Sequence, residues 1–165
     1  MKEKINISIK SHFISLKWLL IYLVVLIIIL LYFYVKIDFD GILVFAFFSL
    51  FQIVPSIYLH FMYFSIDKNK LVEFNDDEIK LTIKNQVYIY KTEDIDKIII
   101  FKSANMDKYG IPFMVFENYY FTKILLKSNS NFILTSLLDN RIEEKLKKIK
   151  NVKFEREKGY SFFKF

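Results

Sequence analysis

The sequence predicts an α+β protein in which a two-helix transmembrane hairpin precedes an antiparallel β-sandwich or barrel closed by one C-terminal amphipathic helix. Three observations predict this fold class. Two long stretches near the amino terminus contain no Asp, Glu, Lys or Arg. Short segments of alternating polar and apolar residues follow one another from residue 70 to 137. Apolar residues then recur at helical spacing between residues 142 and 149.

The first uncharged stretch, residues 18–35, reads WLLIYLVVLIIILLYFYV and is bounded by Lys17 and Lys36. A helix that crosses the hydrocarbon of a membrane needs about 20 mostly apolar residues, and this stretch is long enough. A cleaved signal peptide ends in small residues, whereas this stretch ends in the rings of Tyr32, Phe33 and Tyr34. We therefore expect a membrane span that is retained.

The second uncharged stretch runs from residue 41 to 66 and predicts a span over residues 42–65. Five residues separate it from the first span, so the chain must turn back at once and form an antiparallel hairpin over residues 18–66. Lysines outnumber acidic residues on the flanks of the hairpin, whereas the short turn holds one lysine and two aspartates. The flanking lysines are Lys2, Lys4, Lys10, Lys17, Lys68 and Lys70. The positive-inside rule therefore predicts that both termini are cytoplasmic.

Polar residues gather on one face of the second span, because they recur at intervals of three, four and seven residues. They are Ser49, Gln52, Ser56, His60 and Tyr63, with Pro55 among them. Pro55 leaves a carbonyl without its helical partner, which permits a kink. We call this face the polar stripe. It either packs the two spans together or faces another membrane protein or a second copy of the chain.

A domain over residues 67–150 follows the hairpin. Alternation predicts strands at 70–74, 79–83, 87–91, 97–103, 119–128 and 131–137, and residues 113–118 give a further short strand. Residues 103–113 hold Gly110 and Pro112 and are predicted to form a loop. The strands are separated by compact polar turns, so we expect a meander of hairpins.

The only helix predicted for this domain begins near Asp139 or Asn140, and Asn140 has capping-box spacing to Glu143. Ile142, Leu146 and Ile149 form its apolar stripe. Four lysines lie toward the other side and the carboxyl end: Lys145, Lys147, Lys148 and Lys150. They either form a solvated face that suits the helix dipole or contact a partner or anionic lipid.

The two ends of the chain carry weaker signals. In residues 1–17, Ile5, Ile7 and Ile9 alternate as in a strand, while Ile5, Ile9 and Phe13 also fit a helical face. We favour a strand that adds to the cytoplasmic domain. Residues 151–165 predict a C-terminal strand and an aromatic tail, which either packs on the domain or inserts at the membrane interface. The tail contains Phe162, Phe163 and Phe165.

Three passages, FNDDEIKLTIKN, YKTEDIDKIIIF and LLKSNSNFILTSLLDNRIEEKLKKI, resemble the bacterial pleckstrin-homology-like (PH-like) domains attached to small two-span membrane proteins. The resemblance covers roughly residues 67–150 and implies a fold and a membrane tether, with no catalytic set. Lipid-binding relatives of the eukaryotic pleckstrin-homology type hold inositol phosphates with basic residues on the first hairpin loop. We equate that loop with residues 75–78, where Asp76, Asp77 and Glu78 would repel a phosphorylated headgroup, so we expect no phosphoinositide binding.

The sequence offers no pattern for catalysis or cofactor binding. It has two histidines, no cysteine and three glycines, so we expect neither a metal site nor a phosphate-cradling loop. A net charge of +6 is too small and scattered for nucleic acid, and no small-molecule substrate is evident. We expect a non-enzymatic, multi-pass protein of the bacterial cytoplasmic (inner) membrane that contacts lipid and carries its PH-like domain as a protein-binding platform, for another protein or itself. The alternative is a regulatory or protective subunit acting within the bilayer on a channel, transporter or membrane-acting toxin.

Overall fold

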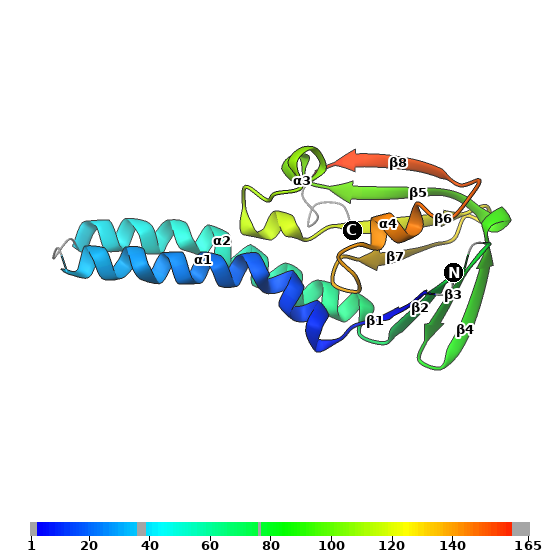
Figure 1. The fold of residues 1–165 in the computed structure, drawn as a ribbon, viewed down its shortest axis with the longest axis horizontal. Helices are drawn as coiled ribbons and strands as arrows, with labels where there is room; N and C mark the ends of the chain where they lie inside the picture. Colours follow the sequence, from blue (N-terminus) through cyan, green and yellow to red (C-terminus); the bar gives the residue numbers. More distant parts are fainter. Residues whose placement is uncertain (1–2, 36–38, 76, 160–165) are drawn as a thin grey trace.

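The computed structural model describes residues 3–35, 39–75 and 77–159. Helices α1 (Ile9–Val35) and α2 (Phe39–Asp67) form the predicted antiparallel hairpin, half of which protrudes from a β-domain (Figure 1). Both helices are long and apolar enough to cross a membrane. Their large side chains are mostly exposed, as at Ile28 (61%) and Leu43 (68%), which is unlike the buried helix of a soluble core. They are therefore two candidate membrane-spanning helices.

The first of two sheets consists of β1 (Glu3–Asn6), β2 (Lys70–Phe74), β3 (Glu78–Ile83) and β4 (Gln86–Lys91), paired in that order and all antiparallel. The tight turn between β3 and β4 places Lys84 and Asn85 at positive φ values of 47° and 69°. Such a turn matches the twist of the two strands it joins.

The short 3-10 helix η1 (Thr92–Asp94) leads to the second sheet. That sheet contains β5 (Ile95–Lys102), β6 (Phe121–Leu126), β7 (Asn131–Thr135) and β8 (Lys153–Lys158) in the order β7-β6-β5-β8. The predicted C-terminal strand is β8, which runs parallel to β5 at the edge of the sheet. Phe162, Phe163 and Phe165 of the aromatic tail lie outside the described residues.

The hairpin is inserted between two neighbouring strands of the first sheet. β1 leads into α1, α2 leads into β2, and Ile5 of β1 pairs opposite Val72 of β2. The two competing periodicities of the amino-terminal segment each apply to a part of it: Ile5 belongs to a strand and is buried, whereas Ile9 and Phe13 are exposed on the first turns of α1. The domain therefore includes residues on both sides of the hairpin.

The main core lies between the two sheets and is closed at one end by α4 (Ile142–Leu146). The three residues of the predicted helical stripe, Ile142, Leu146 and Ile149, are all buried in this core. The sheets contribute mainly aliphatic side chains: Val72, Ile79, Leu81, Ile98, Ile100, Ile124 and Leu134. A sandwich plugged by a terminal helix, as the sequence predicts, is the observed architecture.

Residues 103–118 differ from the prediction. The expected loop contains helix α3 (Ala104–Tyr109), whose first turn is capped by the Ser103 hydroxyl and which ends at Gly110 with φ +67°. The strand predicted at 113–118 is wrong, because the 3-10 helix η2 (Val115–Asn118) occupies this place. The carboxylate of Glu117, almost fully buried, accepts hydrogen bonds from the amides of Phe113 and Met114 and so winds the chain. α4 is thus not the only helix of the domain.

Glu143 ties α4 to the second sheet instead of forming the expected capping box. Its carboxylate accepts hydrogen bonds from Lys102 of β5 at 3.0 Å and from Lys147 at 2.7 Å, and it also pairs with Arg156 of β8. Burial opposes ionisation, but the bonds from Lys147 and Lys102 outweigh it and lower the pKa of Glu143 to about 2. The ionised carboxylate therefore stabilises the closed end of the sandwich.

We predict that Glu143→Gln destabilises the protein at neutral pH by roughly 1.5–3 kcal/mol, the value of hydrogen bonds to a charged group. Because the folded-state pKa lies below the ordinary 4.5, the wild type loses this stabilisation as the pH falls from 4.5 toward 2, and the two stabilities converge. Denaturant unfolding in detergent micelles measures the difference. Glu144→Gln, at an exposed neighbour, is the control. A difference in unfolding free energy between the wild type and Glu143→Gln that does not depend on pH would contradict this account.

Candidate functional site

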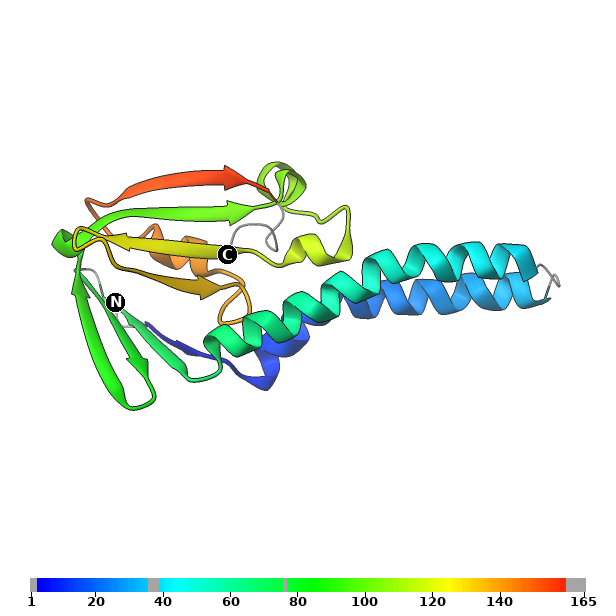
Figure 2. The ribbon, with the colours of Figure 1, turned by 180° about the vertical axis from the view of Figure 1, so that it is seen from behind.

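The carboxyl half of α2 packs against η2 and β7 at the outer face of the second sheet (Figure 2). Ile98 and Ile100 of β5 point into the main core, whereas Ile99 and Phe101 point outward. A second core forms there around Leu59 and Tyr63 of α2 together with residues of the sheet: Ile99, Phe101, Tyr119, Phe121 and Leu137. We call this contact, between residues 52–67 of α2 and the β5–β7 surface with η2, the junction. It is the feature that relates the hairpin to the domain.

His60 of the polar stripe lies at the centre of the junction. Its Nδ1 is 2.9 Å from the hydroxyl of Tyr119, and its Nε2 is 2.9 Å from Nδ1 of His12 in α1. Burial raises the pKa of Tyr119, so the hydroxyl keeps its proton and is able to donate to His60. This chain of hydrogen bonds joins α1, α2 and the residues that precede β6.

Gln52 connects the stripe to η2. Its Oε1 accepts a hydrogen bond from the amide of Val115 at 3.0 Å, and its Nε2 lies 2.7 Å from the sulfur of Met114. On the other helix, the side chain of Asn118 donates to the carbonyl of Ser15 at 3.0 Å. The segment from 113 to 119 is therefore bonded to both helices of the hairpin.

The serines of the stripe pack within the hairpin itself. The Ser49 hydroxyl accepts a bond from Tyr22 of α1 at 2.9 Å and donates to the Phe45 carbonyl at 2.6 Å. Ser56, fully buried next to Pro55, donates to the Gln52 carbonyl at 2.6 Å. Side chains of the stripe are thus bonded within the chain, to α1, to α2 or to the β-domain.

Asp67, which the sequence analysis did not single out, ends α2 and is fully buried. Its Oδ2 accepts hydrogen bonds from the amide of Thr135 at 3.1 Å and from its hydroxyl at 2.6 Å. Its Oδ1 accepts one from Lys70 at 2.9 Å, and Lys70 also donates to the Ile133 carbonyl at 2.6 Å. In the sequence, an acidic residue and a lysine three residues apart at the end of an apolar helix, Asp67 and Lys70, could have indicated this ion pair. This carboxylate attaches the end of α2 to β7.

The lysines beside α4 are engaged in ion pairs of the domain. Lys145 pairs with Glu3 of β1 at 3.1 Å and with Asp139 at 2.6 Å, and Lys148 pairs with Glu3 at 2.8 Å. Hydrogen bonds from Lys148 and Lys145 lower the pKa of Glu3. Lys147 pairs with Glu143, and Lys150 is exposed. Because three of the four lysines have intramolecular counterions, the cluster is a weaker surface for a partner or for anionic lipid than the sequence implied.

The loop at residues 75–78 is not the first strand connection of the domain, as the sequence analysis assumed. The first connection joins β1 to β2 and is the helical hairpin, so residues 75–78 form the second. Asn75 donates to Glu78 at 2.7 Å across that turn, while Asp76 lies outside the described residues. The repulsion argument was therefore applied to the wrong loop.

A hollow of about 280 Å³ lies where β1, the start of α1 and the start of α4 meet. Its lining is mostly polar and basic: Lys4, Asn6, Ser8, Lys10, Ser11, Asp139, Asn140, Arg141 and Lys145. Within residues 3–35, 39–75 and 77–159, no three His, Asp or Glu side chains come together in a way that could hold a metal ion. The geometry on the described chain is that of a structural junction.

The comparison with curated proteins gives no match for this chain. A family model described as PH domain matches residues 4–145. The match begins in β1, extends across both helices and the strands from β2 to β7, and ends in α4. Because the match covers most of the chain and includes the sandwich with its closing helix, the chain belongs to the PH domain family.

Proposed function

We propose that the protein is a non-enzymatic, multi-pass protein of the bacterial cytoplasmic membrane that holds its PH domain on the cytoplasmic side as a docking platform for another protein. The junction is the observation that carries the proposal. A domain tethered by a flexible linker takes all orientations, whereas here the helix that emerges from the domain is packed into its second core. The platform therefore has a fixed orientation relative to the hairpin.

The charge distribution supports the cytoplasmic orientation. Lys4, Lys10 and Lys17 lie before the first span, and Lys68 and Lys70 follow the second, all on the side of the β-domain. Asp40 stands at the opposite end of the hairpin, where α2 begins. The positive-inside rule therefore favours a cytoplasmic domain.

The free edge of β4 is the best docking place for a partner. Among the strands of the described chain, β1, β4, β7 and β8 each stand at the end of a sheet, and β4 pairs only with β3. Val87 and Ile89 are 51% and 56% exposed, whereas Tyr90 turns inward and stacks on Phe132 with 4.8 Å between ring centroids. β4 lies on the part of the domain away from the protruding half of the hairpin (Figures 1 and 2). An extended partner segment could pair with this edge and cover its apolar side chains.

The alternative proposal, a regulatory or protective subunit that acts within the bilayer, relied on the polar stripe as a contact surface. Gln52 and His60 are bonded to the β-domain and to α1, and Ser49 is bonded to Tyr22. These bonds leave the stripe little capacity for another membrane protein. The described structure therefore favours the platform.

We predict that the hairpin spans the membrane with the domain inside. The chain has no cysteine, so an introduced cysteine is the only thiol that the maleimide can label. In spheroplasts, a membrane-impermeant maleimide should label Asp40→Cys, and it should label Ser128→Cys, in the exposed β6–β7 turn, only after the membrane is opened. The protein should also stay in the membrane pellet after alkaline carbonate extraction. Labelling of Ser128→Cys in intact spheroplasts would reverse the topology, and release by carbonate would rule out the span.

We predict that positive charges on the β4 edge weaken binding of the partner protein. The double substitution Val87→Lys with Ile89→Lys places two charges on the outer face of this strand, and recovery of the partner in detergent pull-downs should fall roughly tenfold, equivalent to about 1.4 kcal/mol. Ser128→Lys with Ser130→Lys adds the same charge at an exposed turn and is the matched control. Quantitative mass spectrometry compares the two with the wild type. Equal recovery with the β4 variant and the wild type would exclude this edge.

A further inference from the structure

Large apolar side chains are exposed on the segment that joins α3 to η2. Tyr109, Ile111 and Phe113 are 63%, 60% and 78% exposed. In Figures 1 and 2 this segment lies at the end of the domain that faces the protruding half of the hairpin. We propose that residues 109–113, the contact loop, insert into the near leaflet of the bilayer that the hairpin crosses, as a third, non-spanning membrane contact. The inference rests on the proposed membrane span.

The length of α2 places the contact loop at the depth of the lipid. From Phe39 to Gln52, where α2 first bonds to the domain, the helix rises about 20 Å at about 1.5 Å per residue. The hydrocarbon of a bilayer is about 30 Å thick. If α2 begins at the far surface, Gln52 and the Val115 amide bonded to it lie about 10 Å inside the near surface.

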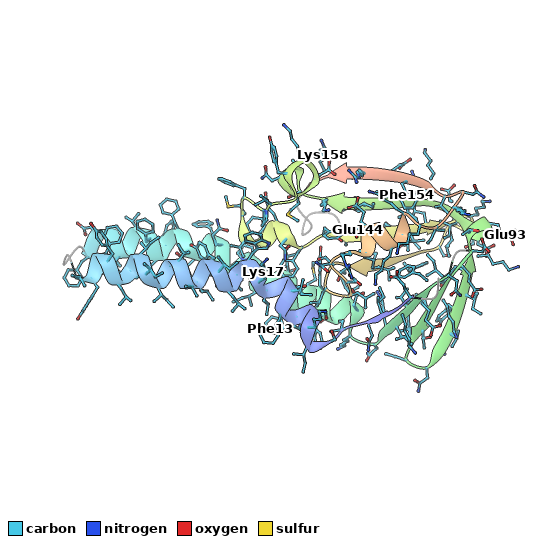
Figure 3. The ribbon with its side chains drawn as sticks, in the orientation of Figure 1. Phe13, Lys17, Glu93, Glu144, Phe154 and Lys158 are labelled. Carbon is cyan, nitrogen blue, oxygen red and sulfur yellow. The ribbon has the colours of Figure 1, made fainter. Side chains whose placement is uncertain are left out.

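The first helix also places Gln52 inside the near surface, at a depth of about 3 Å for a rise of about 1.5 Å per residue. From Trp18 to Val35, α1 rises about 26 Å, close to the hydrocarbon thickness, so Lys17 marks the near surface. Figure 3 shows Lys17 where α1 passes the edge of the domain. Since Tyr22 bonds to Ser49, Gln52 lies level with the turn of α1 that follows Lys17. The residues bonded to Gln52 therefore lie on the membrane side of Lys17.

The amides at the end of the contact loop and directly after it are hydrogen-bonded within the protein. The amides of Phe113 and Met114 donate to Glu117, at 2.7 and 3.3 Å, and the amide of Val115 donates to Gln52. A chain segment enters hydrocarbon at tolerable cost only where its polar groups are satisfied within the protein. Glu117 itself is held by Asn105 at 3.1 Å. The segment that presents Phe113 is therefore both fixed and internally bonded.

Matching pairs of a lysine and a ring occur on the contact loop and on α1. Lys108 lies 4.9 Å from the ring centroid of Tyr109, and Lys17 lies 5.4 Å from that of Trp18. Aromatic rings beside basic side chains are typical of the membrane–water interface, where the ring meets the acyl boundary and the ammonium group meets the headgroups. Lipid is therefore the occupant that the chemistry of the contact loop fits.

The test uses the full-length protein reconstituted in phosphatidylcholine–phosphatidylglycerol vesicles, with Trp18→Phe to remove the single native tryptophan. Into this background we would place one probe at a time: Phe113→Trp or Tyr109→Trp in the contact loop, Ile28→Trp in the hairpin, and Tyr88→Trp on β4. Lipids brominated near the headgroup end of the acyl chain should quench both contact-loop probes. Lipids brominated near the methyl end should quench Ile28→Trp most, and neither lipid should quench Tyr88→Trp.

Each other outcome overturns a defined part of the account. Quenching of Ile28→Trp without quenching of either contact-loop probe would overturn the inserted loop and leave the span intact. Absence of quenching at Ile28→Trp and at both contact-loop probes would overturn the proposed membrane span itself. A Phe113→Trp emission that is shifted to the blue, is not quenched and depends on the protein-to-lipid ratio would show that a second copy of the chain covers the contact loop, which also contradicts insertion.

Discussion

The structure depends on the burial of the outer face of the second sheet beneath α2. β5 carries apolar side chains on both faces, and Ile99 and Phe101 on its outer face share a core with Leu59 and Tyr63 of α2. Burying one such side chain is worth about 1.5–3 kcal/mol, so Leu59 and Tyr63 supply a share of stability that the small sandwich cannot obtain from its main core alone. The hairpin thus contributes to the hydrophobic core through Leu59 and Tyr63 of α2, while both of its helices are candidate membrane spans.

The position of the hairpin between β1 and β2 fixes its direction relative to the β-domain. The helices form the connection between β1 and β2, and β1 pairs with β2 just beyond them, so both chain segments that leave the domain do so as one rigid pair. In lipid-binding relatives of the eukaryotic pleckstrin-homology type, the first strand connection carries the headgroup-binding residues. In this member of the PH domain family the same connection is a candidate membrane anchor. If the hairpin spans the membrane, the domain needs no headgroup-binding loop to stay attached to the membrane.

Elements that depend on local pattern were predictable, and those that depend on distant partners were not. The absence of charge identified the hairpin, and spacing identified Ile142, Leu146 and Ile149 as buried. The KIIIFK run of β5 lacks alternation, which was the available signal that both faces are buried. The turn of η2 is imposed by hydrogen bonds to Glu117, and Asp67 finds Thr135 on a strand 68 residues away. Contacts between residues far apart in the sequence leave no periodic pattern. The contacts of Gln52 and His60 with the domain could not be predicted for the same reason.

The insertion of the hairpin also orders events during biosynthesis. β1 is synthesised before the two helices and cannot pair with β2 until both helices have left the ribosome, because the partner strand begins at Lys70. Closing so long a connection would be slow for a disordered chain, but two helices that have turned back on each other bring the strands together directly. A newly made chain whose second helix fails to return to the starting side would therefore keep β1 and β2 apart. If the hairpin spans the membrane, pairing of β1 with β2 therefore requires that the second helix has returned to the side of β1.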